Sequence, residues 1–318
     1  MKEENYYLRI ADFKTQIRES IESGKMKILP DFRAKDILRL LDESPDVSIS
    51  RPVSQLTWGV PVPGDESQVM YVWMDALSNY ITVLGYPDET IAEWWPAKAQ
   101  FMGKDVLRFH AIIWPAMLLG LGLELPQTIV SHGMILADGQ KMSKSIGNVI
   151  DPIEVIEKHG LEAFRYYFLR HVDTFADADF TWEKFENAYN NELANDLGNL
   201  VQRLATLMVK NGISGVHPEL TMPSEYRELM EKYEYTKAFD LVWEKIQELN
   251  REIDEEKPWT MAKNGETEKL TRCLEGLANK LVRAAYLLGP FLPETSKKVI
   301  AVFDGRVEVP EQPLFPKR

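Results

Sequence analysis

The second half of this chain carries helical patterns and no strand pattern, which restricts that part to an all-helical fold. From Trp182 to Met208, apolar residues recur every three or four positions, so they share one face of a single helix. The stripe consists of Trp182, Phe185, Tyr189, Leu193, Leu197, Leu200, Leu204 and Met208. Gly212 and Gly215 end it, and further helices are expected from about Ser224 to Glu255, from Glu266 to Leu288, and after Pro290 and Pro293. Residues 181–318 are therefore expected to form a helical bundle with an extended tail.

Residues 1–180 alternate strand and helix patterns instead. Helical spacing covers Asp12–Ile21 and Asp31–Leu41. Short apolar runs predict strands at Val47–Ile49, Leu56–Val62, Val69–Trp73, Gln100–Met102 and Thr128–Val130. The third run leads into a helix that reaches Ile81, and the fourth into a helix from Asp105 to about Leu119. Because strands alternate with helices, the last three strands are expected to form a parallel sheet with ligands at its carboxyl edge.

Composition limits the class of protein and its expected cellular location. Of 318 residues, 45% are hydrophobic and 27% charged, which is typical of a globular protein with room for two cores. No run of eighteen apolar residues and no apolar segment near Met1 occurs, so neither a membrane span nor a secretory signal is expected. Cys273 is the only cysteine, which excludes an internal disulfide and a cysteine-based zinc site and suits a cytoplasmic location. A net charge of −12 means that any nucleic-acid binding must rest on a local patch.

One polar loop stands out at residues 135–145. The dipeptide Asp138-Gly139 is typical of a tight turn, and Lys141-Met142-Ser143-Lys144-Ser145 follows it. Two lysines three residues apart can bring mobile point charges to one polyanion, such as a phosphate that moves during reaction. A solvated lysine and serine loop is the alternative.

The five residues Lys141–Ser145 match the second signature of class I aminoacyl-tRNA synthetases, and the chain resembles methionyl-tRNA synthetases from about Glu4 to its end. Matching blocks are Tyr71–Tyr80, Phe101–Asp105 through His110 to Trp114–Ala116, Asn191–Arg203 and Lys257–Trp259. The resemblance implies a partial Rossmann-type parallel sheet, the second half of a class I catalytic domain, followed by an all-α anticodon-binding domain. The family's His-Ile-Gly-His signature and its connective insertion, which often holds zinc, are not found. We therefore expect the carboxyl-terminal part of a synthetase, inactive by itself and completed by an amino-terminal half.

The resemblance also implies a methionine site. Val106, His110 and Trp114 are four residues apart and share a helix face. Together with Trp73, Ala76, Leu77 and Tyr80 they form the expected pocket for a thioether chain. The Tyr80 hydroxyl and a His110 ring nitrogen are expected to donate to its sulfur. An aromatic stripe belonging to the core is the alternative.

ATP is expected to contact a second group of residues. Gly103 follows a strand and permits close backbone approach, and the Asp105 carboxylate can accept ribose hydroxyl groups. Asp105 as a plain helix N-cap is the alternative. Ile135 is expected beside the adenine, and Lys141, Ser143 and Lys144 at the phosphates, with Lys141 and Lys144 as the catalytic charges and Mg²⁺ accompanying ATP.

The bundle carries the expected anticodon site. Asn195, Asn199 and Arg203 advance by four along one helix opposite the leucines, and Trp259 follows a helix break at Pro258. Asn and Arg can read base edges and Trp can stack a base, so the resemblance implies recognition of a CAU anticodon. A solvated helix face and a capping tryptophan are the alternative.

Three functions remain in view. The leading hypothesis is a methionine–tRNA ligase that activates methionine with ATP and transfers it to tRNA(Met). A tRNA-binding fragment without chemistry and a class I synthetase for another apolar amino acid are the alternatives. Pyrophosphate release that depends on methionine separates the first two, and an amino-acid panel tests the third.

Overall fold

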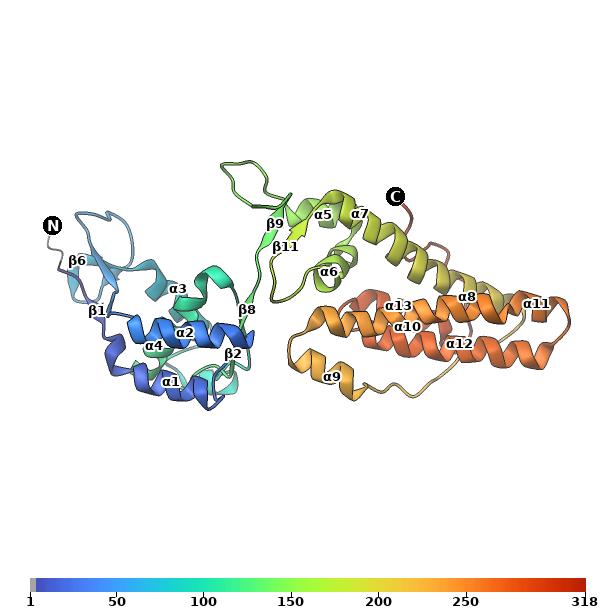
Figure 1. Ribbon diagram of the computed structural model, residues 1–318, viewed down its shortest axis with the longest axis horizontal. Helices are drawn as coiled ribbons and strands as arrows, with labels where there is room; N and C mark the ends of the chain where they lie inside the picture. The colour runs from blue at the N-terminus through green and yellow to red at the C-terminus, as the bar shows by residue number, and fades with distance from the viewer. Residues whose placement is uncertain (1–3) are drawn as a thin grey trace. The chain divides into compact units, whose positions relative to one another are not determined.

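The computed structural model describes residues 4–318, apart from the side chain of Glu89. Met1 to Glu3, part of the terminus expected to lack a secretory signal, lie outside the described residues. The chain divides into two compact units, unit 1 ending at Gly133 and unit 2 beginning at Met134 (Figure 1). Each unit has its own buried core, made by residues 10–129 in unit 1 and 155–315 in unit 2.

The compact units divide earlier than the change of sequence pattern at residue 180. Val155, Tyr167 and Phe180 are buried in the same core as the helical bundle, so the segment from Met134 onward packs as part of unit 2. Composition alone could not locate this division, because residues 134–180 mix strands and helices as unit 1 does.

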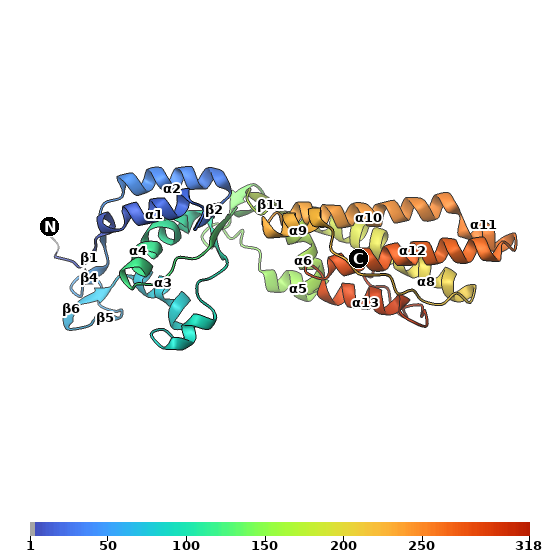
Figure 2. The ribbon, with the colours of Figure 1, turned by 90° about the horizontal axis from the view of Figure 1, so that it is seen from below.

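Unit 1 is built on a parallel three-stranded sheet. Its strands are β2 (Lys27–Leu29), β7 (Gln100–Gly103) and β8 (Thr128–His132), in the order β2-β8-β7. Ile129 and Val130 of the central strand are fully buried, as expected for a strand covered on both faces. The helices are α1 (Lys14–Glu22), α2 (Asp31–Glu43), α3 (Val72–Thr82) and α4 (Trp114–Gly120). Helices α1 and α2 lie side by side in both views (Figures 1 and 2).

The predicted strands at 100–102 and 128–130 are confirmed, but the predicted sheet partner at Val69–Trp73 is wrong. That segment ends strand β6 (Asp65–Met70), which pairs antiparallel with β4 (Ser50–Pro52) and β5 (Pro61–Val62) in a separate sheet. Residues from Val72 onward are already helical. β2 takes the place in the parallel sheet, and it was missed because it has three residues, of which only Ile28 is buried.

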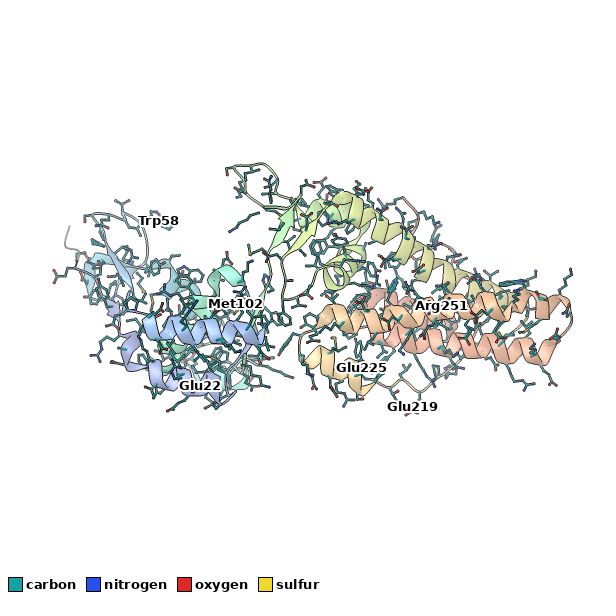
Figure 3. The ribbon with its side chains drawn as sticks, viewed as in Figure 1. Glu22, Trp58, Met102, Glu219, Glu225 and Arg251 are labelled. Atoms are coloured by element: carbon teal, nitrogen blue, oxygen red, sulfur yellow. The ribbon has the colours of Figure 1, made fainter. Side chains whose placement is uncertain are left out.

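The predicted strand at Leu56–Val62 is also mostly wrong. Only Pro61 and Val62 pair, whereas Leu56 donates to the Pro52 carbonyl in a turn and Gly59 has a φ of 152°. Alternating side chains do not become buried there, because Trp58 lies on the loop between β4 and β5 (Figure 3) and is 80% exposed. A two-residue ladder, β1 (Tyr7–Leu8) with β3 (Val47–Ser48), completes the strands described in unit 1.

Continuous helical structure replaces the single α-helix predicted from Asp105 to Leu119. A 3₁₀ turn at Lys104–Val106 and a π-helical turn at Phe109–Ile113 precede α4. Two further 3₁₀ turns lie at Ile10–Asp12 and Glu89–Glu93.

Unit 2 begins with a small sheet of β9 (Ile135–Ala137), β10 (Gln140–Lys141) and β11 (Ala178–Phe180). β10 pairs antiparallel with β9, and β11 pairs parallel with β9. Helices α5 (Pro152–His159) and α6 (Leu161–Arg170) lie between β10 and β11 in sequence. Gly160 has a φ of 90°, which allows the chain to turn between these two helices.

The bundle follows, with its long helices running alongside one another (Figure 2). The first helical run consists of α7 (Trp182–Ala188), a π-helix (Tyr189–Asn199) and α8 (Leu200–Lys210). The others are α9 (Ser224–Glu231), α10 (Tyr235–Glu256), α11 (Pro258–Lys263), α12 (Thr267–Leu288) and α13 (Pro293–Phe303). Among the described helices, none is long and apolar enough to cross a membrane.

The bundle confirms the predicted helices with one correction. The helix predicted from Ser224 to Glu255 is two helices, because Tyr233 adopts the left-handed region with a φ of 59° and interrupts it. The break at Pro258 is confirmed and is made by Lys257, whose φ is 50°. The tail after Phe303 carries no helix, and Phe315 is buried against the bundle.

Candidate active site and nucleic-acid interface

The two lysines lie on and just beyond a tight β-hairpin. Asp138 and Gly139 have φ of 52° and 73° and connect β9 to β10, so both occupy the left-handed region of a type I′ turn. The predicted turn is confirmed. Lys141 pairs with Leu136 across the hairpin, which places the start of the signature on a regular strand.

The charged side chains of this hairpin are open to solvent. Lys141 and Lys144 are exposed, and among residues 4–318 no carboxylate forms an ion pair with either. Ser143 is half-buried, and its hydroxyl lies 2.7 Å from that of Ser145. Uncompensated ammonium groups beside small hydroxyl side chains suit a phosphate chain, because they can neutralise charge that develops on its oxygens. Ile135, at the start of β9, is 37% exposed, so an apolar surface is available there.

Gly103 and Asp105 lie at the carboxyl end of the parallel sheet in unit 1. Gly103 ends β7 opposite His132, the last residue of β8. A Cβ at Gly103 would lie 2.7 Å from Asp105 Oδ1, so a larger residue would displace that carboxylate. Asp105 is exposed within the 3₁₀ turn, and no side-chain hydrogen bond caps that turn. The N-cap position of that turn is Gly103 rather than Asp105.

Aromatic residues of α3 and of the helix before α4 meet in unit 1. The Tyr80 hydroxyl lies 3.0 Å from His110 Nε2, and the Trp73 ring meets the His110 ring edge-on at 6.0 Å. Trp114 lies 5.9 Å from the Tyr80 ring. The structure thus brings together the predicted aromatic members of the methionine group.

The remaining members differ in their surroundings. Val106 is half-buried and accepts a 3.0 Å hydrogen bond from His110 through its carbonyl. Leu77 is fully buried in the core of unit 1, whereas Ala76 is exposed on the same helix. Leu77 is therefore a core residue of unit 1, whereas Ala76 is open to solvent beside it.

The predicted hydrogen-bond donors of the methionine site already have partners within the protein. Because the Val106 carbonyl can only accept, His110 Nδ1 carries the hydrogen, and Nε2 accepts from the Tyr80 hydroxyl. Burial lowers the pKa of His110 and raises that of Tyr80, so both stay neutral near pH 7. Neither residue has a spare hydrogen for a thioether sulfur in this arrangement. Trp114, which is fully buried, has an indole N–H without a partner among the described residues.

Three of the four predicted anticodon residues lie on one helical run. Asn195 and Asn199 are exposed on the π-helix, and neither side chain bonds to another described residue. Arg203 of α8 donates to Asp254 at 2.8 Å, close to the end of α10. Trp259 is the second residue of α11, lies five residues after Asp254 in the chain, and is 43% exposed. The Arg203–Asp254 pair therefore links the asparagine face to the helix that leads to Trp259.

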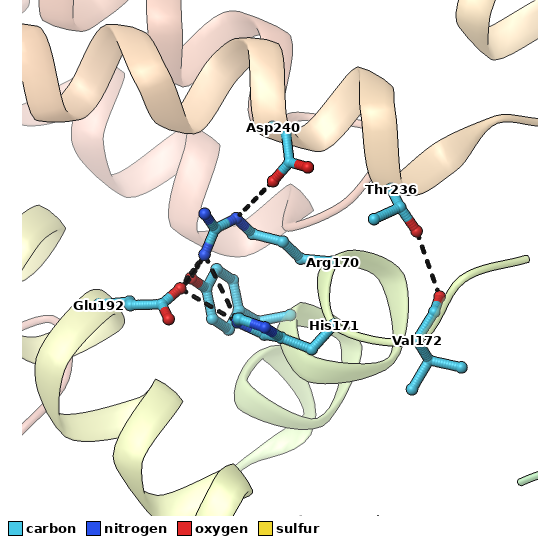
Figure 4. A network of polar contacts seen from close by, with 7 residues as sticks. Arg170, His171, Val172, Glu192, Thr236 and Asp240 are labelled. Atoms are coloured by element: carbon cyan, nitrogen blue, oxygen red, sulfur yellow. Dashed lines mark hydrogen bonds and ion pairs between the residues drawn. The ribbon is translucent and has the colours of Figure 1, made fainter. Parts of the chain in front are cut away.

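A partly buried polar cluster in unit 2 was missed by sequence reasoning. Arg170 at the end of α6 contacts Glu192 of the π-helix and lies 3.2 Å from Asp240 of α10 (Figure 4). Glu192 also accepts from Tyr166, and His171 lies 3.1 Å from it. Burial and the nearby arginine lower the pKa of His171 to about 4, so the ring stays neutral. Sequence reasoning missed it because Glu192 and Asp240 lie far from Arg170 in the chain.

No ligating cluster for a metal ion occurs among the described residues, where no group of three or more His, Cys, Asp or Glu side chains could hold one.

A parallel sheet with its helices and a Lys-Met-Ser-Lys-Ser hairpin fit the class I aminoacyl-tRNA synthetases. The sequence model of the family described as tRNA synthetases class I (M) matches residues 1–205. The methionine–tRNA ligase of Thermotoga maritima is 37% identical over 98% of the chain, and that of Clostridium acetobutylicum is 39% identical over 94%. The chain belongs to the methionyl-tRNA synthetase family.

A solved structure agrees with this assignment. The chain is similar to the Mycobacterium tuberculosis methionyl-tRNA synthetase in complex with methionyl-adenylate, with a TM-score of 0.89 and 29% identity. The match covers 99% of this chain and 69% of that one. The chain spans about half the length of the curated relatives, 52% and 49% of the Thermotoga and Clostridium proteins.

Proposed function

We propose that the chain is the carboxyl-terminal portion of a methionine–tRNA ligase. The observation that carries the proposal is the presence, in a member of this family, of both the Trp73, Tyr80 and His110 cluster and the exposed lysine hairpin. The relatives are methionine–tRNA ligases, which supports the reaction class. The proposed location of the reaction is the cytoplasm, where aminoacylated tRNA is used in protein synthesis.

The proposed reaction has two steps. The carboxylate of methionine attacks the α-phosphorus of ATP, the bond to the bridging oxygen breaks, and pyrophosphate leaves with its electron pair. A ribose hydroxyl at the 3′ end of tRNA(Met) then attacks the methionyl carbonyl, and AMP leaves. Mg²⁺ enters as part of the ATP substrate.

The residues have distinct proposed roles. Lys141 and Lys144 neutralise charge on the departing phosphates, Ser143 binds a phosphate oxygen, and Asp105 with Gly103 holds the ribose. Ile135 packs beside the adenine. The methionine side chain contacts Trp73, Ala76, Leu77, Tyr80, Val106, His110 and Trp114. Because Tyr80 and His110 use their hydrogens on protein acceptors, Trp114 carries the uncommitted donor for this pocket.

The bundle binds the CAU anticodon in this proposal. Asn195 and Asn199 present uncommitted amides to base edges, Arg203 adds a guanidinium held by Asp254, and Trp259 stacks on a base. An amino-terminal half with the His-Ile-Gly-His signature is the proposed partner that completes the ATP site.

The test is methionine-dependent exchange of pyrophosphate into ATP by the chain combined with an amino-terminal half. We expect exchange with methionine and little with leucine, isoleucine or valine. Exchange driven equally by another amino acid would assign a different synthetase.

A fragment that only binds tRNA is the second candidate. It is favoured by one observation, namely that unit 2 has its own buried core and carries the whole asparagine and Trp259 surface. Binding of tRNA with no exchange in the completed enzyme would establish this candidate in place of the first.

A further inference from the structure

The lysine loop, defined as residues 138–148, is held by two side chains outside its five-residue signature. Asp179 of β11 accepts a 2.7 Å hydrogen bond from the Gly139 N–H at the hairpin turn. Asn148 accepts a 2.8 Å hydrogen bond from the Ser143 N–H and donates to the Lys141 carbonyl at 3.3 Å. None of these contacts belongs to the lysine ammonium groups themselves.

Asp179 acts on the hairpin from the neighbouring strand. It lies opposite Leu136 in the parallel pairing of β11 with β9, so its backbone holds one strand and its carboxylate holds the turn. Its other oxygen lies 3.6 Å from Lys184 Nζ on the first turn of α7. The turn that precedes Lys141 is therefore tied to the helical run of unit 2.

Asn148 closes the far end of the lysine loop. A carboxamide has an acceptor and a donor side by side, which matches an N–H and a carbonyl two residues apart on the same backbone. The Ser143 carbonyl in turn accepts from the Ile146 and Gly147 N–H groups at 3.2 and 3.1 Å. The segment with Lys144 is thus a closed turn, and the Asn148 side chain stabilises it through two hydrogen bonds to its backbone.

We infer that Asp179 and Asn148 are positioning residues for the two lysines. Asp179 sets the hairpin that carries Lys141, and Asn148 sets the backbone from Lys141 to Lys144. The inference rests on the proposed function for its catalytic consequence, since a lysine must lie where phosphate charge develops in order to stabilise it. The structural half of the inference does not need that function.

The first experiment measures backbone amide hydrogen exchange by mass spectrometry on the chain itself, at a concentration below that of its self-association. Asp179→Ala should speed exchange at Gly139 about tenfold, and Asn148→Ala should do so at Ser143, the usual effect of losing one such hydrogen bond. Asp179→Asn keeps an acceptor oxygen and should retain the protection of Gly139. Unchanged exchange in both alanine variants would overturn the inference.

The second experiment uses the enzyme completed with its amino-terminal half. Asp179→Ala and Asn148→Ala should lower kcat for methionine-dependent pyrophosphate exchange about 10- to 100-fold, a typical cost of misplacing a catalytic group, with KM for methionine unchanged. Asp179→Asn should restore most of the rate, whereas Asn148→Asp should not, because it cannot donate to the Lys141 carbonyl. Asn264→Ala, at the end of α11, is the matched control that should leave the rate unchanged.

The two experiments separate the two ideas. If the completed wild-type enzyme shows no exchange, the proposed function fails, and amide exchange still decides whether these residues hold the loop. If wild type is active and both alanine variants keep its kcat, the positioning role is wrong while the proposed function stands.

Discussion

In the contact between Tyr80 and His110, the position of one hydrogen decides which residue donates and which accepts. The resemblance to methionyl-tRNA synthetases predicted that these two residues share a site, and the structure joins them at 3.0 Å. Which of them donates could not be predicted, because it depends on the Val106 carbonyl, a backbone group that no residue type specifies. Asp179 and Asn148 were missed for a similar reason, since they bind backbone atoms.

Replacing His110 should change how stability depends on pH. Burial lowers its pKa below the ordinary value of 6.5, so the unfolded chain takes up the proton first as the pH falls. Stability from the neutral ring is therefore present above pH 6.5 and declines as the pH falls toward the lower pKa of the folded state. Thermal unfolding at pH 7.5 and 5.5 should show a smaller difference in His110→Gln than in wild type. An equal difference in both proteins would mean that folding does not lower the pKa of the His110 ring.

Lys144→Ala should slow methionyl-adenylate formation in the completed enzyme while leaving methionine affinity nearly unchanged. The ammonium group is exposed and unpaired among the described residues, so its charge is available to departing phosphates. Loss of one preorganised charge should cost ~3 kcal/mol of transition-state stabilisation. Pre-steady-state kinetics measures this rate, with Lys245→Ala as an exposed lysine control. An unchanged activation rate would remove Lys144 from the mechanism.

At the scale of elements, the long helical run of unit 2 explains an unusual sequence spacing. Phe185, Tyr189, Leu193 and Leu197 are strictly four apart and all are buried. An α-helix has 3.6 residues per turn, whereas the wider π-helix at Tyr189–Asn199 has about 4.4, and a mixture keeps a spacing of four on one line. The stripe predicted a helix correctly. The uniform spacing of four between buried apolar residues was the sequence feature that could have indicated the π-helical part of this run.

The same helical run carries the polar side chains of Asn195 and Asn199, and its Arg203 pairs with Asp254 of the helix that leads to Trp259. Trp259→Ala should weaken binding of tRNA with a CAU anticodon by about 1–3 kcal/mol, the usual worth of one base stack. Asn199→Ala should additionally reduce discrimination against other anticodons, because hydrogen bonds to base edges carry the sequence information. Binding is measured at one fixed salt concentration, with Trp58→Ala as a control for losing an exposed indole. Equal affinity of Trp259→Ala and wild type would return this residue to a structural role.

At the scale of the whole molecule, helices were easier to predict than sheets. The bundle helices depend on local periodicity, and all of them occur, with one extra break at Tyr233. Sheet membership depends on pairing between distant segments, which is why β6 was assigned to the wrong sheet and β2 was missed. The division at Gly133 likewise reflects which side chains share a core rather than any local pattern.

Unit 1 gives the last prediction, which concerns the chain in isolation. Within the described residues, β2 and β7 are both edge strands of the parallel sheet, each paired only with β8. Trp58, Trp94 and Val72 of the same unit are 80%, 70% and 64% exposed. Open strand edges and exposed apolar side chains favour self-association. The purified chain should therefore associate at micromolar concentration and show no methionine-dependent pyrophosphate exchange.

Two further samples test whether the open sheet edges of unit 1 cause the association. Residues 134–318 produced alone should be monomeric and helical, because unit 2 has its own core and lacks the parallel sheet. Co-expression of the full chain with an amino-terminal synthetase half should restore a defined complex and exchange activity together, since the added strands would cover the open edges. Sedimentation measures association and pyrophosphate exchange measures activity in the same samples. A monomeric full chain that forms methionyl-adenylate without the other half would show that unit 1 needs no partner, and the account of its sheet edges and ATP site given above would be wrong.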